Sequence, residues 1–147
     1  MVYYVSNSLS GILPDAQVDA QSLLVRLLGL VPLEVTHDLA LWQPLTYMFV
    51  HTSGMHLLMN MLGLWWFGAE VERFFGSKLF WRYYVLAGLA GALAAIALSW
   101  SSPSVTIGAS GAIFGLLIAY GFLFPNRTLM LYFVIPVKAK YCVMIFA

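Results

Sequence analysis

A long stretch of this chain carries no charged side chain. Between Tyr83 and Asn126 there is no Asp, Glu, Lys or Arg, and most of the residues are apolar. The whole chain is 62% hydrophobic and 9% charged, whereas soluble domains carry about a quarter charged residues. This composition indicates a protein whose solvent is a lipid bilayer. The net charge of +1 gives no sign of nucleic-acid binding.

Several apolar segments predict membrane-spanning helices. The spans that we expect lie at about residues 54–69, 79–100 and 111–124, with the start of another at 141–147. The second segment carries small residues at four-residue spacing, Ala87, Gly91 and Ala95. Such a stripe allows close approach of a neighbouring helix, because packing holds helices together in lipid. The lone cysteine, Cys142, excludes an intramolecular disulfide and reads as a small apolar residue.

The part of the chain before the first span is predicted to be an outer loop, over residues 6–53. Within it, residues 16–31 are apolar on one side but too short and too polar to cross a membrane. We therefore expect an amphipathic helix lying in the membrane interface. Residues 1–5 are compatible with the last turn of a membrane helix. The predicted fold is an all-α polytopic helix bundle, a single incomplete membrane domain over residues 1–147.

Basic residues predict the orientation of the chain. Six of the seven Lys and Arg lie in two connections, at 70–82 and 125–140. Basic connections favour the cytoplasmic side, so we expect both loops on the inner face of a bacterial cytoplasmic membrane. The first and third spans would then run inward from the outer side. The polar residues that this arrangement places in the outer half are His51, His56, Asn60 and Ser110.

Two polar residues of the first span share a helix face. His56 and Asn60 are four residues apart, so they can point at one partner. Polar groups in spans are costly and tend to face protein or a water-filled cavity. His51 lies on another side and would serve a separate contact or cap the helix start. One alternative is that these are interfacial polar residues without a function, and another is that they bind a metal. The metal is disfavoured because there are few imidazoles and no nearby carboxylate. We expect no cofactor.

A glycine-flanked serine stands where the uncharged outer connection turns into the third span, in Gly108-Ala109-Ser110-Gly111. The first backbone N–H groups of a helix are unpaired and carry a partial positive charge, so they are ready donors to an oxyanion. The alternative is that Ser110 caps the helix while Gly111 and Gly115 form a packing face.

The third span is short. Residues 111–124 would extend about 21 Å as a helix, against roughly 30 Å of hydrocarbon. If the inner end reaches the interface at Pro125, Ser110 lies recessed in a depression that must admit water. Such a site would suit cleavage of a peptide bond within or near the membrane.

Together these motifs resemble the signature of rhomboid intramembrane serine proteases. His51-x₄-His56-x₃-Asn60 is followed by Gly-x-Ser-Gly on a later span. The surrounding segments WQPLTYMFVHTSGMHLLMN, Glu72-Arg73, Gly76-Ser77 and GASGAIFGLL agree, and the match covers about residues 27–147.

The resemblance implies a Ser–His dyad protease in which Ser110 is the nucleophile. It implies an oxyanion hole made by His56, Asn60 and the backbone N–H of Ser110. His51 would hold the outer loop and helix start in place, and Glu72 would be a structural contact at the cytoplasmic end. The other residues that we expect to be structural near the site are Trp42, Gly108 and Gly111.

The chain departs from the family pattern in two places. The outer loop has Trp42-Gln43 where the family often has Trp-Arg, which predicts that a guanidinium contact is absent there. The family's base is a histidine in an Ala-His-x-x-Gly context on the last core helix, whereas His37 matches no catalytic position. We therefore expect a fragment truncated at both ends, inactive and unstable alone, from an enzyme that cleaves single-span membrane proteins near the outer interface. The alternatives are a non-catalytic relative that binds membrane clients and a transporter fragment.

Overall fold

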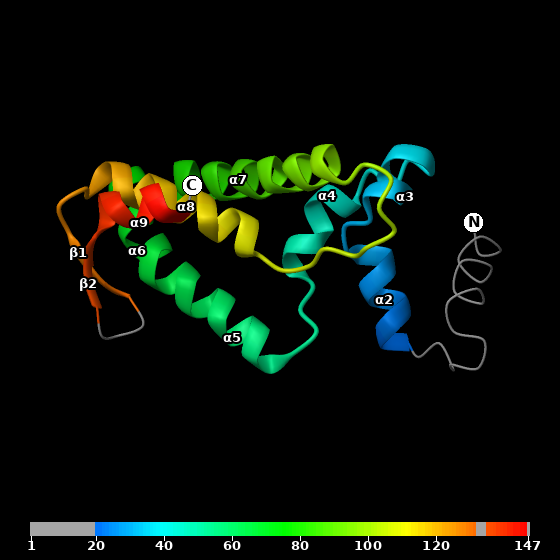
Figure 1. Ribbon diagram of the computed structural model, residues 1–147, viewed down its shortest axis with the longest axis horizontal. Helices are drawn as coiled ribbons and strands as arrows, with labels where there is room; N and C mark the ends of the chain where they lie inside the picture. The colour runs from blue at the N-terminus through cyan, green and yellow to red at the C-terminus, as the bar shows by residue number, and fades with distance from the viewer. Residues whose placement is uncertain (1–19, 132–134, 147) are drawn as a thin grey trace.

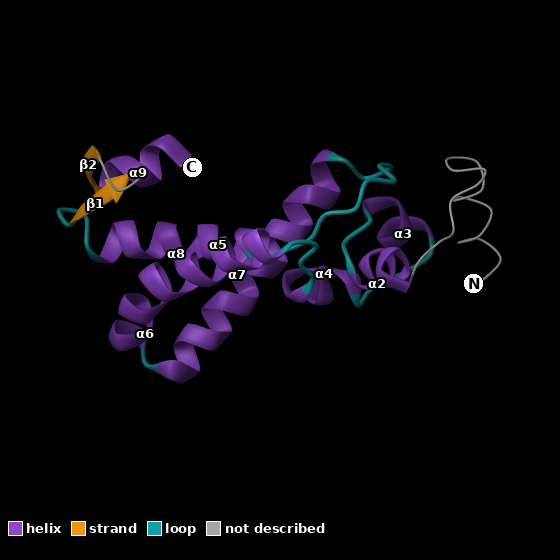
Figure 2. Ribbon diagram, turned by 90° about the horizontal axis from the view of Figure 1, so that it is seen from below, coloured by secondary structure: helices purple, strands orange, loops and turns teal. Residues whose placement is uncertain are grey.

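The computed structural model describes residues 20–131 and 135–146, and these residues are mostly helical (Figure 1). Two helices, α7 (Ser77–Leu98) and α8 (Ser110–Leu123), pack against each other, and α7 crosses α8 obliquely in the view of Figure 2. The short helices of the outer loop lie at one end of the long axis of the molecule, and a small hairpin lies at the other (Figure 2). The predictions for residues 1–19, including the start of the interfacial helix, lie outside the described residues.

The outer loop folds into short helical pieces. They are α2 (Ala20–Leu28), α3 (Pro32–His37), α4 (Gln43–Thr46) and the 3₁₀ turn η1 (Tyr47–Phe49). Prolines occupy the first turns of α3 and α4, where their missing N–H groups cost nothing. Leu30 pairs through its backbone with Thr106, in the connection that leads to α8. The outer loop is thereby attached to the segment that precedes Ser110.

A half-buried polar network holds the outer loop together. The side chain of Gln43 is 1% exposed; its oxygen accepts the backbone N–H of Val31 at 2.9 Å, and its nitrogen donates to Glu34 Oε2 at 2.9 Å. Arg26 Nε donates to the other oxygen of Glu34 at 2.7 Å. A guanidinium thus takes part in this network, but it comes from α2 and not from position 43. Sequence alone could not find this contact, because Arg26 and Glu34 meet only when α2 and α3 fold back on each other.

The first predicted span is a continuous helical segment with a widened turn. It consists of α5 (Gly54–Gly63), the π-helical turn η2 (Leu64–Gly68) and α6 (Ala69–Phe75), so it runs beyond the predicted end at residue 69. Ser53 caps its start, since its hydroxyl oxygen accepts the backbone N–H of His56 at 3.1 Å. Gly76, at φ 74°, ends it.

The second and third spans pack closely against each other. They are α7 (Ser77–Leu98) and α8 (Ser110–Leu123). A Cβ built on Gly91 would lie 3.3 Å from the Cα of Gly111, and one built on Gly115 would overlap the Cβ of Ala87. The small-residue stripe predicted on α7 therefore faces the glycines of α8. Within the described residues, α7 is the one helix that is long and apolar enough to cross a membrane by itself.

The connection after α8 contains a β-hairpin that the all-α prediction does not include. Strands β1 (Thr128–Leu131) and β2 (Ile135–Lys138) pair antiparallel, with Thr128 opposite Lys138. Helix α9 (Ala139–Phe146) follows and packs on α8, with Cys142 buried. Short apolar runs of this length do not distinguish a strand from a helix end. The mostly helical fold class is confirmed, with this hairpin added.

The contact between α7 and α8 can be tested by adding one methyl group. Gly115→Ala should lower the free energy of unfolding of the full-length protein by about 1–3 kcal/mol, because the new Cβ overlaps Ala87. Gly54→Ala is the matched control, since a Cβ there meets nothing within 4 Å. Denaturation in detergent micelles measures both. Equal stability of the two variants would contradict the close approach.

Candidate active site

Ser110 is the first residue of α8, and its side chain is exposed. The N-cap position belongs to Ala109, which makes no side-chain cap. Among the described residues, neither the hydroxyl nor the backbone N–H of Ser110 has a hydrogen-bond partner. The alternative in which Ser110 caps the helix is therefore wrong. The packing face proposed in that alternative does exist, because Gly111 and Gly115 both contact α7.

Gly108 brings the polar face of α5 against the segment that leads into α8. Its φ of 100° lies in the left-handed region, where glycine is favoured. A Cβ at this position would lie 2.6 Å from Nε2 of His56 and 3.7 Å from Nδ2 of Asn60. The two side chains predicted to share a face thus converge on the residue two before Ser110.

The amide of Asn60 is buried and only partly used. The residue is 5% exposed, and Nδ2 donates one hydrogen bond to the backbone carbonyl of His56 at 2.8 Å. The nitrogen carries a second hydrogen. This second hydrogen is donated to no acceptor within the described ranges. The side chain is therefore held in place by its own helix while retaining one donor.

His51 contacts the ring of His56. The two ring centroids are 5.0 Å apart and the planes meet at 65°, an edge-on arrangement. The Nε2 atom of His51 is buried and has no hydrogen-bond partner among the described residues. The two rings are therefore in contact, with His51 in the segment before α5 and His56 in the first turn of that helix.

Tyr47 connects three parts of the site. Its backbone carbonyl accepts the N–H of Gly108 at 2.9 Å, and its hydroxyl donates to the carbonyl of Gly88 on α7 at 2.7 Å. The same hydroxyl lies 3.0 Å from where a Cβ of Gly111 would be. Burial raises the pKa of Tyr47 above its ordinary value, so the hydroxyl stays a protonated donor. The sequence offered no sign of this role, because an aromatic residue near an interface reads as membrane anchoring.

The remaining predicted site residues lie farther from Ser110. Trp42 donates from Nε1 to the carbonyl of Leu27 at 2.8 Å and so ties α4 to the end of α2. Glu72 accepts a hydrogen bond from the Ser77 hydroxyl at 2.7 Å, at the turn between α6 and α7. His37 is exposed at the end of α3. No group of three or more His, Cys, Asp or Glu side chains that could hold a metal occurs in the described part of the chain.

Residues 38–147, more than half of the chain, match the Rhomboid domain family. The chain belongs to the rhomboid family. Its resemblance to that family is thus confirmed, and the protein is a membrane protein. Proteases are among the named relatives of the chain in this family.

Curated relatives show the same similarity. The chain is 43% identical over 76 residues to Rhomboid protease GluP of Bacillus subtilis (strain 168), covering 52% of this chain and 14% of that protein. It is 39% identical over 95 residues to Rhomboid protein 1, mitochondrial, of Saccharomyces cerevisiae (strain ATCC 204508 / S288c), covering 60% and 27%. It is 32% identical over 93 residues to RHOMBOID-like protein 5 of Arabidopsis thaliana, covering 63% and 30%. The chain spans less than a third of the length of each of these relatives. No solved structure matches it.

The contact between Gly108 and His56 can be tested against a matched glycine. Gly108→Ala and Gly76→Ala both place a side chain at positive φ, at 100° and 74°, and such backbone strain costs about 1–3 kcal/mol. Only Gly108 also meets His56, since nothing lies within 4 Å of a Cβ on Gly76. Gly108→Ala should therefore be the more destabilising of the two in denaturation of the full-length protein.

A double-mutant cycle isolates this contact. In a His56→Ala background, the loss of unfolding free energy caused by Gly108→Ala should decrease toward the loss caused by Gly76→Ala. The loss caused by Gly76→Ala should be the same in both backgrounds. If the cost of Gly108→Ala is the same in both backgrounds, His56 does not contact Gly108.

The hydroxyl of Tyr47 is expected to stabilise the junction of the outer loop with α7. Tyr47→Phe removes the second hydrogen bond accepted by the carbonyl of Gly88, which lies inside α7, so the free energy of unfolding should fall by about 0.5–1.5 kcal/mol. Tyr141→Phe removes an exposed hydroxyl and should change stability by less than about 0.5 kcal/mol. Thermal unfolding of both variants distinguishes them, and a neutral Tyr47→Phe would show that the hydrogen bond contributes nothing.

Proposed function

We propose that this chain forms the nucleophile and oxyanion half of an intramembrane serine endopeptidase. The observation that carries the proposal is the convergence of His56 and Asn60 on Gly108, beside a serine whose hydroxyl is exposed and unpaired among the described residues. Membership of the rhomboid family supports it. A metal site built on the histidines would not explain why a glycine-flanked serine stands at the start of a helix.

The chemistry follows from the surroundings of Ser110. Its Oγ would attack the scissile carbonyl carbon, and the carbonyl oxygen would become an oxyanion. The backbone N–H of Ser110 has no hydrogen-bond partner among the described residues and stands at the positive end of α8. The oxyanion would accept hydrogen bonds from this N–H, from the remaining amide hydrogen of Asn60 and from Nε2 of His56. Donors already in place stabilise this charge most, since nothing has to reorganise during the reaction.

A base must remove the proton of Ser110 Oγ and later deliver it to the leaving amine, because a neutral hydroxyl is a poor nucleophile. The family resemblance assigns this role to a histidine in an Ala-His-x-x-Gly context. The sequence in hand contains no Ala-His pair. We therefore assign the base to a part of the protein outside these 147 residues, while His56 stays on the oxyanion side.

The depth of the site favours a transmembrane substrate. Gly111 lies against Gly91, and α7 continues from there to Leu98, about 10 Å farther. Ser110 would therefore lie well below the outer end of α7, as the short third span predicts. A peptide bond near the outer interface of a single-span protein would reach this depth, provided that the 70–82 and 125–140 loops are cytoplasmic.

The nucleophile can be tested in the full-length protein reconstituted with a single-span test substrate. Ser110→Ala should reduce cleavage to background, because the substitution removes the hydroxyl that would form the acyl-enzyme. Ser104→Ala is the matched control: Ser104 is exposed in the connection before α8, and its loss should leave kcat/KM unchanged. Cleavage by the Ser110→Ala variant at the rate of the parent would sink the protease proposal and favour a non-catalytic binder.

A further inference from the structure

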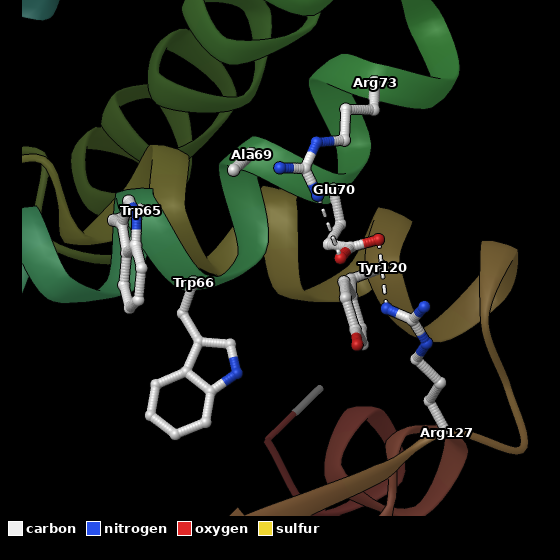
Figure 3. A pocket seen from close by; sticks show the side chains of 7 residues that line it. All are labelled: Trp65, Trp66, Ala69, Glu70, Arg73, Tyr120 and Arg127. Atoms are coloured by element: carbon white, nitrogen blue, oxygen red, sulfur yellow. Dashed lines mark hydrogen bonds and ion pairs between the residues drawn. The ribbon is translucent and has the colours of Figure 1, made fainter.

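A hollow lies near the end of α8 that is opposite to Ser110. It has a volume of about 460 Å³ and lies between the α5–α6 segment, the end of α8 and the turn that follows (Figure 3). Tyr120 lies about 15 Å along α8 from Ser110, so this pocket is separate from the candidate active site. The residues that line it are Trp65, Trp66, Ala69, Glu70, Arg73, Tyr120 and Arg127.

The pocket carries a surplus of positive charge. Glu70 stands between two guanidinium groups: Arg127 Nη1 lies 3.0 Å from Glu70 Oε2, and Arg73 Nη1 lies 3.5 Å from Oε1 (Figure 3). One carboxylate therefore faces two cations. The arginine side chains are 53% and 77% exposed, and each guanidinium has five N–H donors. Donors are thus left over for an anion that enters the pocket.

More basic residues lie at the same end of the molecule. The hairpin places Lys138 opposite Thr128, and the backbone N–H of Ala139 donates to the carbonyl of Arg127 at 2.8 Å. Lys138 and Lys140 are exposed beside this junction. The field around Arg127 is therefore positive beyond the pocket itself, which attracts an anionic surface.

The opposite wall of the pocket is aromatic. Trp65 is 70% exposed and Trp66 is 36% exposed, and both project from the π-helical turn η2. Indole rings favour the boundary between headgroups and acyl chains. A soluble phosphate would use the arginines but not this apolar wall. The ligand that satisfies both is an amphiphile with an anionic head.

We propose that this pocket binds the headgroup of an anionic phospholipid, with the phosphate on Arg127 and Arg73 and the acyl chain along Trp65 and Trp66. The proposal rests on the chain being a membrane protein and is independent of the chemistry at Ser110. In the predicted orientation the lipid comes from the cytoplasmic leaflet, whose anionic lipids attract basic pockets between helices.

Quenching of tryptophan fluorescence tests the site in the full-length protein. The protein is placed in phosphatidylcholine nanodiscs that contain traces of phosphatidylglycerol with brominated acyl chains, or of phosphatidylcholine brominated in the same way. Brominated phosphatidylglycerol should quench more strongly, and this excess should disappear in a Trp65→Phe/Trp66→Phe variant. Inorganic phosphate should not displace the lipid. Equal quenching by both lipids, or displacement by phosphate, would overturn the proposal.

Charge variants assign the binding to the pocket. Arg73→Gln and Arg127→Gln should each weaken the preference for phosphatidylglycerol about fivefold. Lys78→Gln/Arg82→Gln removes two exposed charges at the same end but outside the pocket, and should keep the preference. An equal loss in this control would show diffuse surface attraction instead of a site.

A variant that acts in the opposite direction separates binding from folding. Glu70→Gln removes the carboxylate that competes for both arginines and preserves hydrogen bonding, so it should strengthen the preference for phosphatidylglycerol about fivefold. A fold damaged by the substitution would bind less. Unchanged or weaker binding by Glu70→Gln would contradict the proposed role of the two arginines.

Discussion

The close approach of α7 and α8 is the constraint on which the rest of the structure depends. It is possible only because Gly91 faces Gly111 and Ala87 faces Gly115. In a bilayer the hydrophobic effect does not hold two apolar helices together, so the contact relies on packing and on hydrogen bonds to backbone groups. A tyrosine hydroxyl supplies one such bond: Tyr83 on α7 donates to the carbonyl of Gly115 on α8 at 2.7 Å. Tyr47 adds a bond from the outer loop to the carbonyl of Gly88 on α7. Glycine and alanine residues and a tyrosine hydroxyl thus stabilise the same interface.

The outer loop depends on this helix pair and also positions the site. Tyr47 stands where the loop, α7 and the start of α8 meet, and its carbonyl holds the N–H of Gly108. Behind it, Glu34 receives hydrogen bonds from Arg26 and Gln43. A buried charge is tolerated when a partner and further hydrogen bonds satisfy it. The loop is therefore a folded element with its own polar network, and it holds the backbone of Gly108 through the carbonyl of Tyr47.

Much of the geometry of the candidate site was predictable from the sequence, because it depends on the spacing of residues within single helices. The four-residue spacing of His56 and Asn60 places both on one face of any helix, and glycines beside Ser110 indicate a helix start. The supporting contacts were not predictable. Arg26 reaches the carboxylate of Glu34 from a different helix. The role of the Tyr47 hydroxyl depends on where α7 lies. The hairpin after α8 reads as a loop, because short apolar runs carry no clear periodicity.

The π-helical turn Leu64–Gly68 has a consequence for comparing this chain with its relatives. A π turn contains one more residue than an α turn, so it acts as a single-residue insertion inside a helix that is otherwise unbroken. The half that carries His56 and the half that carries Glu70 are consequently out of phase with a uniform α-helix. A relative without the widened turn would place the residues equivalent to His56 and Glu70 on the same two faces with one residue fewer between them. Alignment of the two halves should therefore be made separately, with the gap placed among the tryptophans.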